Sequence, residues 1–241
     1  REDVVEVLVL SRHIIKAGGA AAGLVTLVSG PVPAGPFPVP AGSAQTFTWH
    51  FLATGTGRAA FNATAGANPC DGDAAGTLVQ VPALMDARLA AVPNPASTGQ
   101  SFLVTLTVTN TGQAALAGLT MEPLLLAGTG NAGLLAGPWP VPPLSLPGGS
   151  AIVFTWTFTA TLAGPVRFST TVTAADANSG VAMPAAHPAV VLTVQRPAVL
   201  EGGPLTAQPD PVCGGNLVSV VATVTNTGEA AALDVGGPAL S

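Results

Sequence analysis

The feature that most constrains this chain is an internal repeat about one small domain long. The segment Phe47-Thr48-Trp49-His50-Phe51 returns 107 positions later as Phe154-Thr155-Trp156-Thr157-Phe158. Alternate residues of a β-strand point to opposite faces of the sheet, so the three rings of each copy share one face. We expect these rings to lie in the cores of two equivalent domains; an exposed aromatic strip that stacks on sugar is the alternative. The expected core residues are Phe47, Trp49, Phe51, Phe154, Trp156 and Phe158.

Other matches indicate where the repeats begin and end. Gly30-Pro31 corresponds to Gly137-Pro138 at the same offset of 107, and the sequence VTNTG at residues 108–112 returns at residues 224–228. Solenoid repeats are about 20–50 residues long, so a period this large indicates separate domains. We expect a worn or truncated first repeat at 1–82, a complete second repeat at 83–196, and a partial third repeat at 197–241.

The two ends of the chain suggest a fragment of a longer protein. The third repeat has only its first strands, the first repeat has a degraded opening, and no Met begins the sequence. One hypothesis is that the third repeat of one copy completes the first repeat of another copy by strand addition, which would build an open filament. Trimming of a longer chain explains the ends equally well.

The composition excludes several classes of partner. Charged residues are 8% of the 241 residues and the formal net charge is −5, so we expect no nucleic acid and no anionic membrane as partner. Pro and Gly interrupt every apolar run before it reaches the roughly 18 residues of a membrane helix, so we expect no membrane insertion. At 48% hydrophobic residues, each repeat can build a core.

The apolar residues alternate as in half-buried strands. In residues 102–109 the apolar residues at even positions alternate mainly with threonines, and residues 218–224 show a similar inward pattern. Asn110-Thr111-Gly112 ends its strand with residues that suit a turn. About seven strands separated by turns, without helical periodicity, predict an all-β fold. We expect tandem immunoglobulin-like (Ig-like) antiparallel β-sandwiches.

The second repeat resembles a known family. The sequence GQSFLVTLTVTNTG at residues 99–112, followed by PGGSAIVFTWTFTATLAG at 147–164, is similar to the CARDB-type domain. This is a cell-adhesion-related domain of bacterial surface and secreted proteins, one of several Ig-like families with a VTNTG strand end. The resemblance implies an extracellular, non-catalytic spacer or adhesion module, and it carries over no catalytic residue.

No set of residues predicts a catalytic or cofactor site. The chain has no GxSxG elbow and no phosphate-binding loop, so we expect no enzyme and no cofactor. The three histidines lie in different parts of the repeats, which argues against a metal centre. Calcium takes six to eight oxygen ligands, so turn formation is the stronger interpretation of the weak calcium candidates. Those candidates are Asp71, Asp73, Asp176 and Asn178.

Two cysteines occupy different repeats. Cys70 lies in a late turn of the first repeat, and Cys213 precedes a core strand of the third. A whole domain separates them, so a direct bond is not expected, because disulfides need Cα atoms within about 7 Å. Each is a possible half-cystine whose partner lies outside this segment, which would indicate an oxidising compartment. Two unrelated thiols are the alternative.

The leading functional hypothesis is a structural module outside a bacterial cell: a stalk, a spacer or a filament subunit. Its partners would be neighbouring repeats or further copies of itself. Short Pro-containing junctions at Val81-Pro82-Ala83 and Arg196-Pro197-Ala198 would limit bending between domains. The alternative hypothesis is an adhesin-type module that recognises a glycan or a surface protein through its end loops.

Overall fold

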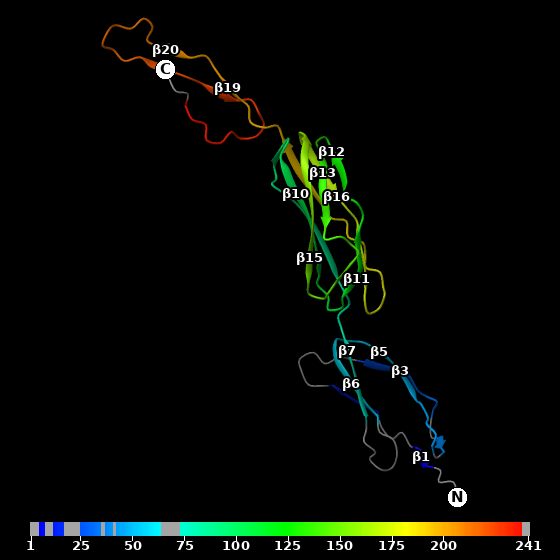
Figure 1. The fold of residues 1–241 in the computed structure, drawn as a ribbon. Coiled ribbons are helices and arrows are strands. Elements are labelled where there is room, and N and C mark those ends of the chain that lie inside the picture. Colours follow the sequence, from blue (N-terminus) through cyan, green and yellow to red (C-terminus); the bar gives the residue numbers. More distant parts are fainter. Residues whose placement is uncertain are drawn as a thin grey trace. The chain divides into compact units, whose positions relative to one another are not determined.

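The described part of the chain is built of β-strands and contains no helix (Figure 1). The structure, a computed structural model, describes residues 5–7, 12–16, 25–34, 37–40, 42–63 and 73–237. By contacts the chain divides into two compact units, Arg1–Pro82 and Ala83–Ser241. The division falls where the sequence places its first repeat junction. The division into three repeats stays a prediction, because residues 197–241 do not separate from the second unit.

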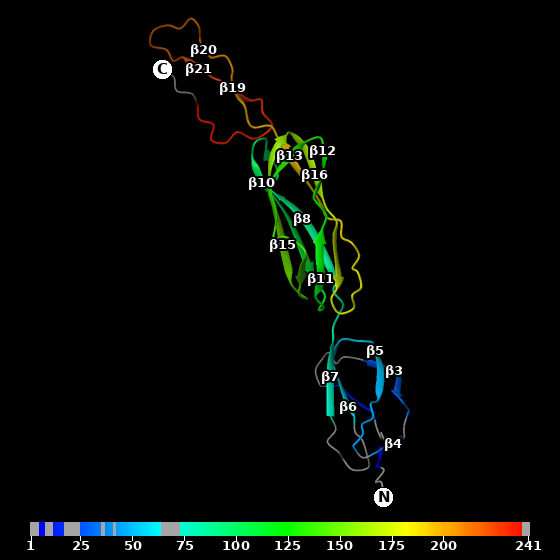
Figure 2. The same cartoon turned by 45° about the vertical axis from the view of Figure 1, so that its right-hand side comes forward.

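The second repeat is a two-layer sandwich of Ig-like type (Figures 1 and 2). One layer is the four-stranded antiparallel sheet β13-β15-β10-β8. The facing layer holds the sheets β14-β11-β17 and β12-β16-β18-β9, antiparallel except where β18 meets β9. The strands are β8 (Met85–Val92), β9 (Ala96–Ser97), β10 (Ser101–Asn110), β11 (Leu116–Met121), β12 (Leu125–Gly128), β13 (Asn131–Trp139), β14 (Leu144–Leu146), β15 (Ala151–Leu162), β16 (Gly164–Ser169), β17 (Val172–Asp176) and β18 (Ala189–Gln195).

Hydrogen bonds join the two sheets of the facing layer. The backbone N–H of Glu122 donates to the carbonyl of Thr171 at 3.0 Å. The hydroxyl of the buried Thr170 donates to the carbonyl of Glu122 at 2.6 Å. Strands β16 and β17 are therefore one strand interrupted at residues 170–171. This interruption is one reason why the whole repeat, β8 to β18, has more strand segments than the about seven strands expected.

The core of the second repeat lies between these layers. Phe154, Trp156 and Phe158 on β15 are 0%, 4% and 2% exposed, in agreement with the alternation. The ring of Phe158 lies 5.8 Å from that of Phe102 and 5.1 Å from that of Phe168, measured between centroids. Edge-to-face and offset contacts at these separations add to the burial of apolar area. The aromatic strand thus anchors the sandwich.

The first repeat copies this arrangement in its described part. In the pairing of β3 with β5, Leu27 lies opposite Phe51, just as Leu134 lies opposite Phe158. The rings of Phe51 and Phe61 are 4.8 Å apart, which matches the contact of their equivalents in the second repeat. The strands are β1 (Val5–Val7), β2 (Arg12–Lys16), β3 (Val25–Val32), β4 (Phe37–Val39), β5 (Thr48–Ala53), β6 (Gly57–Ala63) and β7 (Asp73–Val79).

Burial of the first aromatic strand is weaker than the sequence predicts. Phe47, Trp49 and Phe51 are half-buried, whereas Thr48 and His50 between them are exposed. The alternation is therefore present, but the fully buried state of the second repeat is not reached. Among the described residues, β5 pairs with β3 alone, whereas its equivalent β15 lies between two strands. A strand with one partner leaves more of its side chains open to water.

The third repeat also departs from the prediction. Val218, Val220 and Val224, expected to face inward, are 43%, 41% and 42% exposed. In the second repeat, β10 pairs with β15, and the facing layer of the sandwich covers the inner side of both strands. Residues 197–237 form only two-stranded sheets, so the equivalent valines stay exposed. The strands are β19 (Leu200–Gly202), β20 (Thr206–Gln208), β21 (Ser219–Val221) and β22 (Val224–Asn226).

Within the described ranges, no helix is long and apolar enough to cross a membrane.

Candidate functional site at the repeat junction

The VTNTG sequence builds a hydrogen-bonded corner where the second repeat begins. Asn110 is the last residue of β10, and it is 0% exposed. Its Oδ1 accepts from the backbone N–H of Leu84 at 3.2 Å and from that of Gly112 at 3.1 Å. Its Nδ2 donates to the carbonyls of Ala114 at 2.8 Å and Leu146 at 3.2 Å. Three separate segments thus meet at one buried amide, which makes four hydrogen bonds and uses both its donors and its acceptor.

The third repeat forms the same corner around Asn226. Its Oδ1 accepts from the N–H of Val199 at 3.2 Å and from that of Gly228 at 3.0 Å. Its Nδ2 donates to the carbonyl of Ala230 at 2.8 Å. These are three of the four bonds made by Asn110, at equivalent positions. The recurring sequence therefore has a recurring physical role: it fixes the entering chain to the end of the first long strand.

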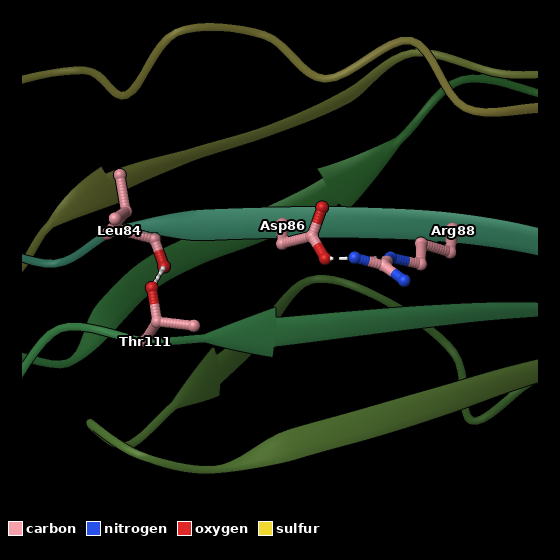
Figure 3. Close-up of polar contacts among 4 residues, drawn as sticks. All are labelled: Leu84, Asp86, Arg88 and Thr111. Atoms are coloured by element: carbon pink, nitrogen blue, oxygen red, sulfur yellow. Dashed lines mark hydrogen bonds and ion pairs between the residues drawn. The ribbon is translucent and has the colours of Figure 1, made fainter.

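Thr111 adds a second link to the entering chain. Its backbone N–H donates to the carbonyl of Leu84 at 2.8 Å, and its hydroxyl reaches the same carbonyl at 3.4 Å. Figure 3 shows this contact, and it also shows the ion pair between Asp86 and Arg88, which lie two residues apart on β8. Thr227 makes the same pair of bonds to Val199, at 2.8 and 3.4 Å.

Asp176 holds the entering chain from the other layer. It ends β17 and is 4% exposed. Its Oδ2 accepts from the backbone N–H of Ala83 at 2.7 Å. Its Oδ1 accepts from the backbone N–H groups of Asn178 and Ser179, both at 2.9 Å, and from the Ser179 hydroxyl at 3.1 Å. These bonds, with that from Ala83 the strongest, hold the pKa of the Asp176 carboxyl below its ordinary value, although burial acts in the opposite direction.

The Gly-Pro matches mark a close approach between two strands. Gly137 has a φ of +112°, and a Cβ built there would lie 2.6 Å from the Thr155 carbonyl oxygen and 2.8 Å from the Trp156 Cα. Gly30 has a φ of +111° and the same distances to Thr48 and Trp49. No residue with a side chain fits at either position. Each glycine therefore lets an irregular edge strand press against the backbone of the aromatic strand.

The calcium candidates do not assemble a site among the described residues. Both carboxylate oxygens of Asp176 already accept hydrogen bonds, and Asn178 contributes a backbone N–H to them. Asp71 lies outside the described residues, and Asp73 begins β7 with its side chain undescribed. No group of three or more His, Cys, Asp or Glu that could hold a metal ion occurs in the ranges the structure describes.

The cysteine hypothesis stays a prediction. Cys213 is exposed and free, close to a turn in which Asn216 donates to its carbonyl at 3.1 Å. Cys70 lies outside the described residues.

Sequence reasoning missed the role of Asn110, although a signal was present. It interpreted Asn110 as a turn former, whereas the structure makes it the centre of a buried network. Positions 102, 104, 106 and 108 face inward, so position 110 continues the buried series. Asp176 likewise continues the buried series of β17, in which Val172 and Ala174 face inward. A polar residue in the buried parity of a strand was the available signal.

Comparisons with known proteins give only distant matches. No protein-family model matches the chain, and no curated protein matches it. A mutant of Salmonella alpha-2-macroglobulin matches with a TM-score of 0.37 and 19% identity, over 72% of this chain and 11% of that one. The native conformation of E. coli alpha-2-macroglobulin matches with a TM-score of 0.37 and 20% identity, over 71% and 10%. The chain thus spans about a tenth of those proteins, and similarity at this level carries no argument about function.

Proposed function

We propose that this chain is a non-catalytic spacer made of tandem Ig-like domains, belonging to a bacterial protein that acts outside the cell. The recurrence of the junction corner carries the proposal. Asn110 and Asn226 tie the entering chain to the same strand end with equivalent hydrogen bonds, in successive repeats.

The junction corner suits a chain that bears load. Leu84 and Ala83 are held through their backbone N–H groups by Asn110 and Asp176, which come from opposite layers of the sandwich. Hydrogen bonds to a carboxylate are about twice as strong as neutral ones. Tension applied at the start of the repeat would meet these bonds before it reached the core.

The resemblance to the CARDB-type domain points in the same direction, and it includes the extracellular location. The small number of charged residues, 8%, and the 48% hydrophobic content fit a chain rich in covered β-surface. The hypothesis of an oxidising compartment for Cys213 belongs to this proposal, because a half-cystine needs such a compartment.

Single-molecule force spectroscopy on the whole chain tests the proposal. Released residues extend the chain by about 3.3–3.6 Å each, so unfolding of residues 83–196 lengthens it by about 40 nm before the folded length is subtracted. We expect one discrete step equal to this length less the folded end-to-end length of the repeat. The Asp176→Asn variant should unfold at lower force with the same step length. A chain that lengthens gradually, without this step, would contradict a load-bearing role.

A further inference from the structure

The outer face of the sheet β13-β15-β10-β8 carries few charges and is rich in threonine, with the exposed Val92 and Val153 beside the threonines. We call it the threonine face, and define it by Leu103, Thr105, Thr107, Trp139, Thr155 and Thr157. In register, Trp139 lies opposite Thr155, and Thr155 lies opposite Thr105. Register partners in antiparallel strands project to the same side of the sheet, so these side chains form one continuous row.

Trp139 is the most unusual residue of this face. It is 76% exposed, whereas Trp156 on the neighbouring strand is 4% exposed. Pro138 and Pro140 flank it, and a proline ring fixes its own φ near −65°. The preceding Gly137 presses against the backbone of Trp156. The backbone that carries the indole is therefore restrained, and little main-chain freedom remains at this position for a ligand to remove.

The threonines offer hydroxyl groups around the indole. Thr105, Thr107, Thr155 and Thr157 are all half-buried, and in the described part of the chain no hydrogen bond engages their side chains. An apolar partner would strip water from these hydroxyls without replacing its hydrogen bonds, which is costly. A ligand that lies flat on this face must bring donors and acceptors as well as an apolar surface.

The charges on this face narrow the chemical class of the ligand further. The charged residues in register on this face are Asp86 and Arg88, which pair with each other at 3.0 Å (Figure 3). Arg88 lies opposite Thr107, away from the Trp139 row. Nucleic acids and acidic polysaccharides need clustered, available cations. An almost neutral face is complementary to a neutral ligand.

We propose that the threonine face binds a neutral polysaccharide, with one sugar ring stacked on Trp139. A pyranose ring presents an apolar C–H face to the indole, and its hydroxyls exchange hydrogen bonds with the hydroxyls of Thr155 and Thr105. The indole and the threonine hydroxyls thus each have a matching group on one ligand. The site lies on the sheet, away from the end loops, and it adds a contact along the spacer itself.

A sedimentation depletion assay tests the site with the whole chain and three insoluble probes: microcrystalline cellulose, chitin and starch granules. We expect retention on at least one, unaffected by molar salt because no ion pair contributes. Trp139→Ala should weaken retention about tenfold, the loss of one aromatic contact. Trp139→Phe should keep most of it, and Arg88→Gln should leave it unchanged.

A second variant guards against misfolding. Thr155→Val keeps the shape of a β-branched side chain but removes the hydroxyl, and it should weaken retention severalfold while the melting temperature stays unchanged. Failure of the wild type to bind any of the three probes would overturn the proposal, as would full binding by Trp139→Ala. A wild-type dimer that Trp139→Ala converts to a monomer would overturn it too, by assigning this face to a second copy of the chain.

Discussion

Asn110 is a polar residue at a position where its strand otherwise buries apolar side chains. Val104, Leu106 and Val108 on the same face of β10 are 0% exposed, as Asn110 is. A buried amide is costly unless all its groups are bonded, and here they are. The need to bond every group of the amide favours a single arrangement of the chain, the one that brings Leu84, Ala114 and Leu146 to Asn110. We regard this as the reason that the repeat needs Asn and not another turn former.

Replacing Asn110 with Ala should lower the free energy of unfolding by about 3 kcal/mol, because the substitution leaves buried donors and acceptors unpaired. Asn226→Ala is the matched control. Its equivalent network is exposed to water, so it should cost less than about 1 kcal/mol. Urea unfolding of both variants measures the difference. Equal losses in the two repeats would show that burial of the network is unimportant.

Asp176 makes the stability of the second repeat depend on pH. Its folded pKa is depressed, chiefly by the Ala83 N–H, so the carboxylate stabilises the fold above its unfolded pKa of about 3.9. That contribution is lost as the pH falls through the lower, folded pKa. Asp176→Asn removes the titration while keeping the side-chain shape. Thermal melts from about pH 7 to about pH 2 should show the wild type losing its advantage over Asp176→Asn in acid. An advantage that grew on acidification would refute this assignment.

At the scale of elements, the irregular edge strand β13 is paired to β15 through a close glycine contact. Register shifts between Leu134 and Ala136, and between Ala136 and Trp139, accompany Gly137. The same shifts occur between Leu27 and Val32 in the first repeat. Bulges of this kind bend an edge strand and discourage edge-to-edge pairing with other molecules. The Gly-Pro match in the sequence is therefore the mark of a conserved strand geometry within the chain.

Gly137→Ala should destabilise the second repeat by about 2–4 kcal/mol, because the new Cβ meets the β15 backbone at a positive φ. Gly149→Ala is the matched control. Gly149 has a φ of +72° but nothing within 4 Å of a built Cβ, so only conformational strain of about 1 kcal/mol applies. Denaturant midpoints separate the two effects. If both variants lost the same stability, the close contact would have no energetic weight.

The strands and their inward faces could be predicted from alternation, but their degree of burial could not. Val108 and Val224 occupy the same place in VTNTG, and they are 0% and 42% exposed. A sequence period of two residues tells which side of a strand is apolar; it does not tell whether another layer covers that side. The exposure of Trp139 could not be predicted from the alternation either, because the prolines on both sides of it interrupt the pattern.

At the scale of the whole molecule, one repeated sequence pattern recurs along an all-β chain whose second repeat is an Ig-like β-sandwich. The second repeat has the closed core, and the first repeat shares its register and its Phe–Phe contact. Part of the candidate site could be predicted, because the recurrence of VTNTG indicates a repeated structure. The hydrogen bonds to Leu84 and Ala83 could not, because they join chain segments that are far apart in the sequence. Partners about 26 and 93 residues apart leave no local pattern to recognise.

Hydrogen exchange of the whole chain, resolved by peptide, tests the central claim most directly. Core strands of a sandwich open only by global unfolding, whereas exposed two-stranded sheets open locally. The account predicts that β10 and β15 exchange slowest and with one common opening free energy, and that β21 and β22 exchange orders of magnitude faster. Exchange of β10 and β15 as fast as β21 and β22 would contradict a closed sandwich in residues 83–196.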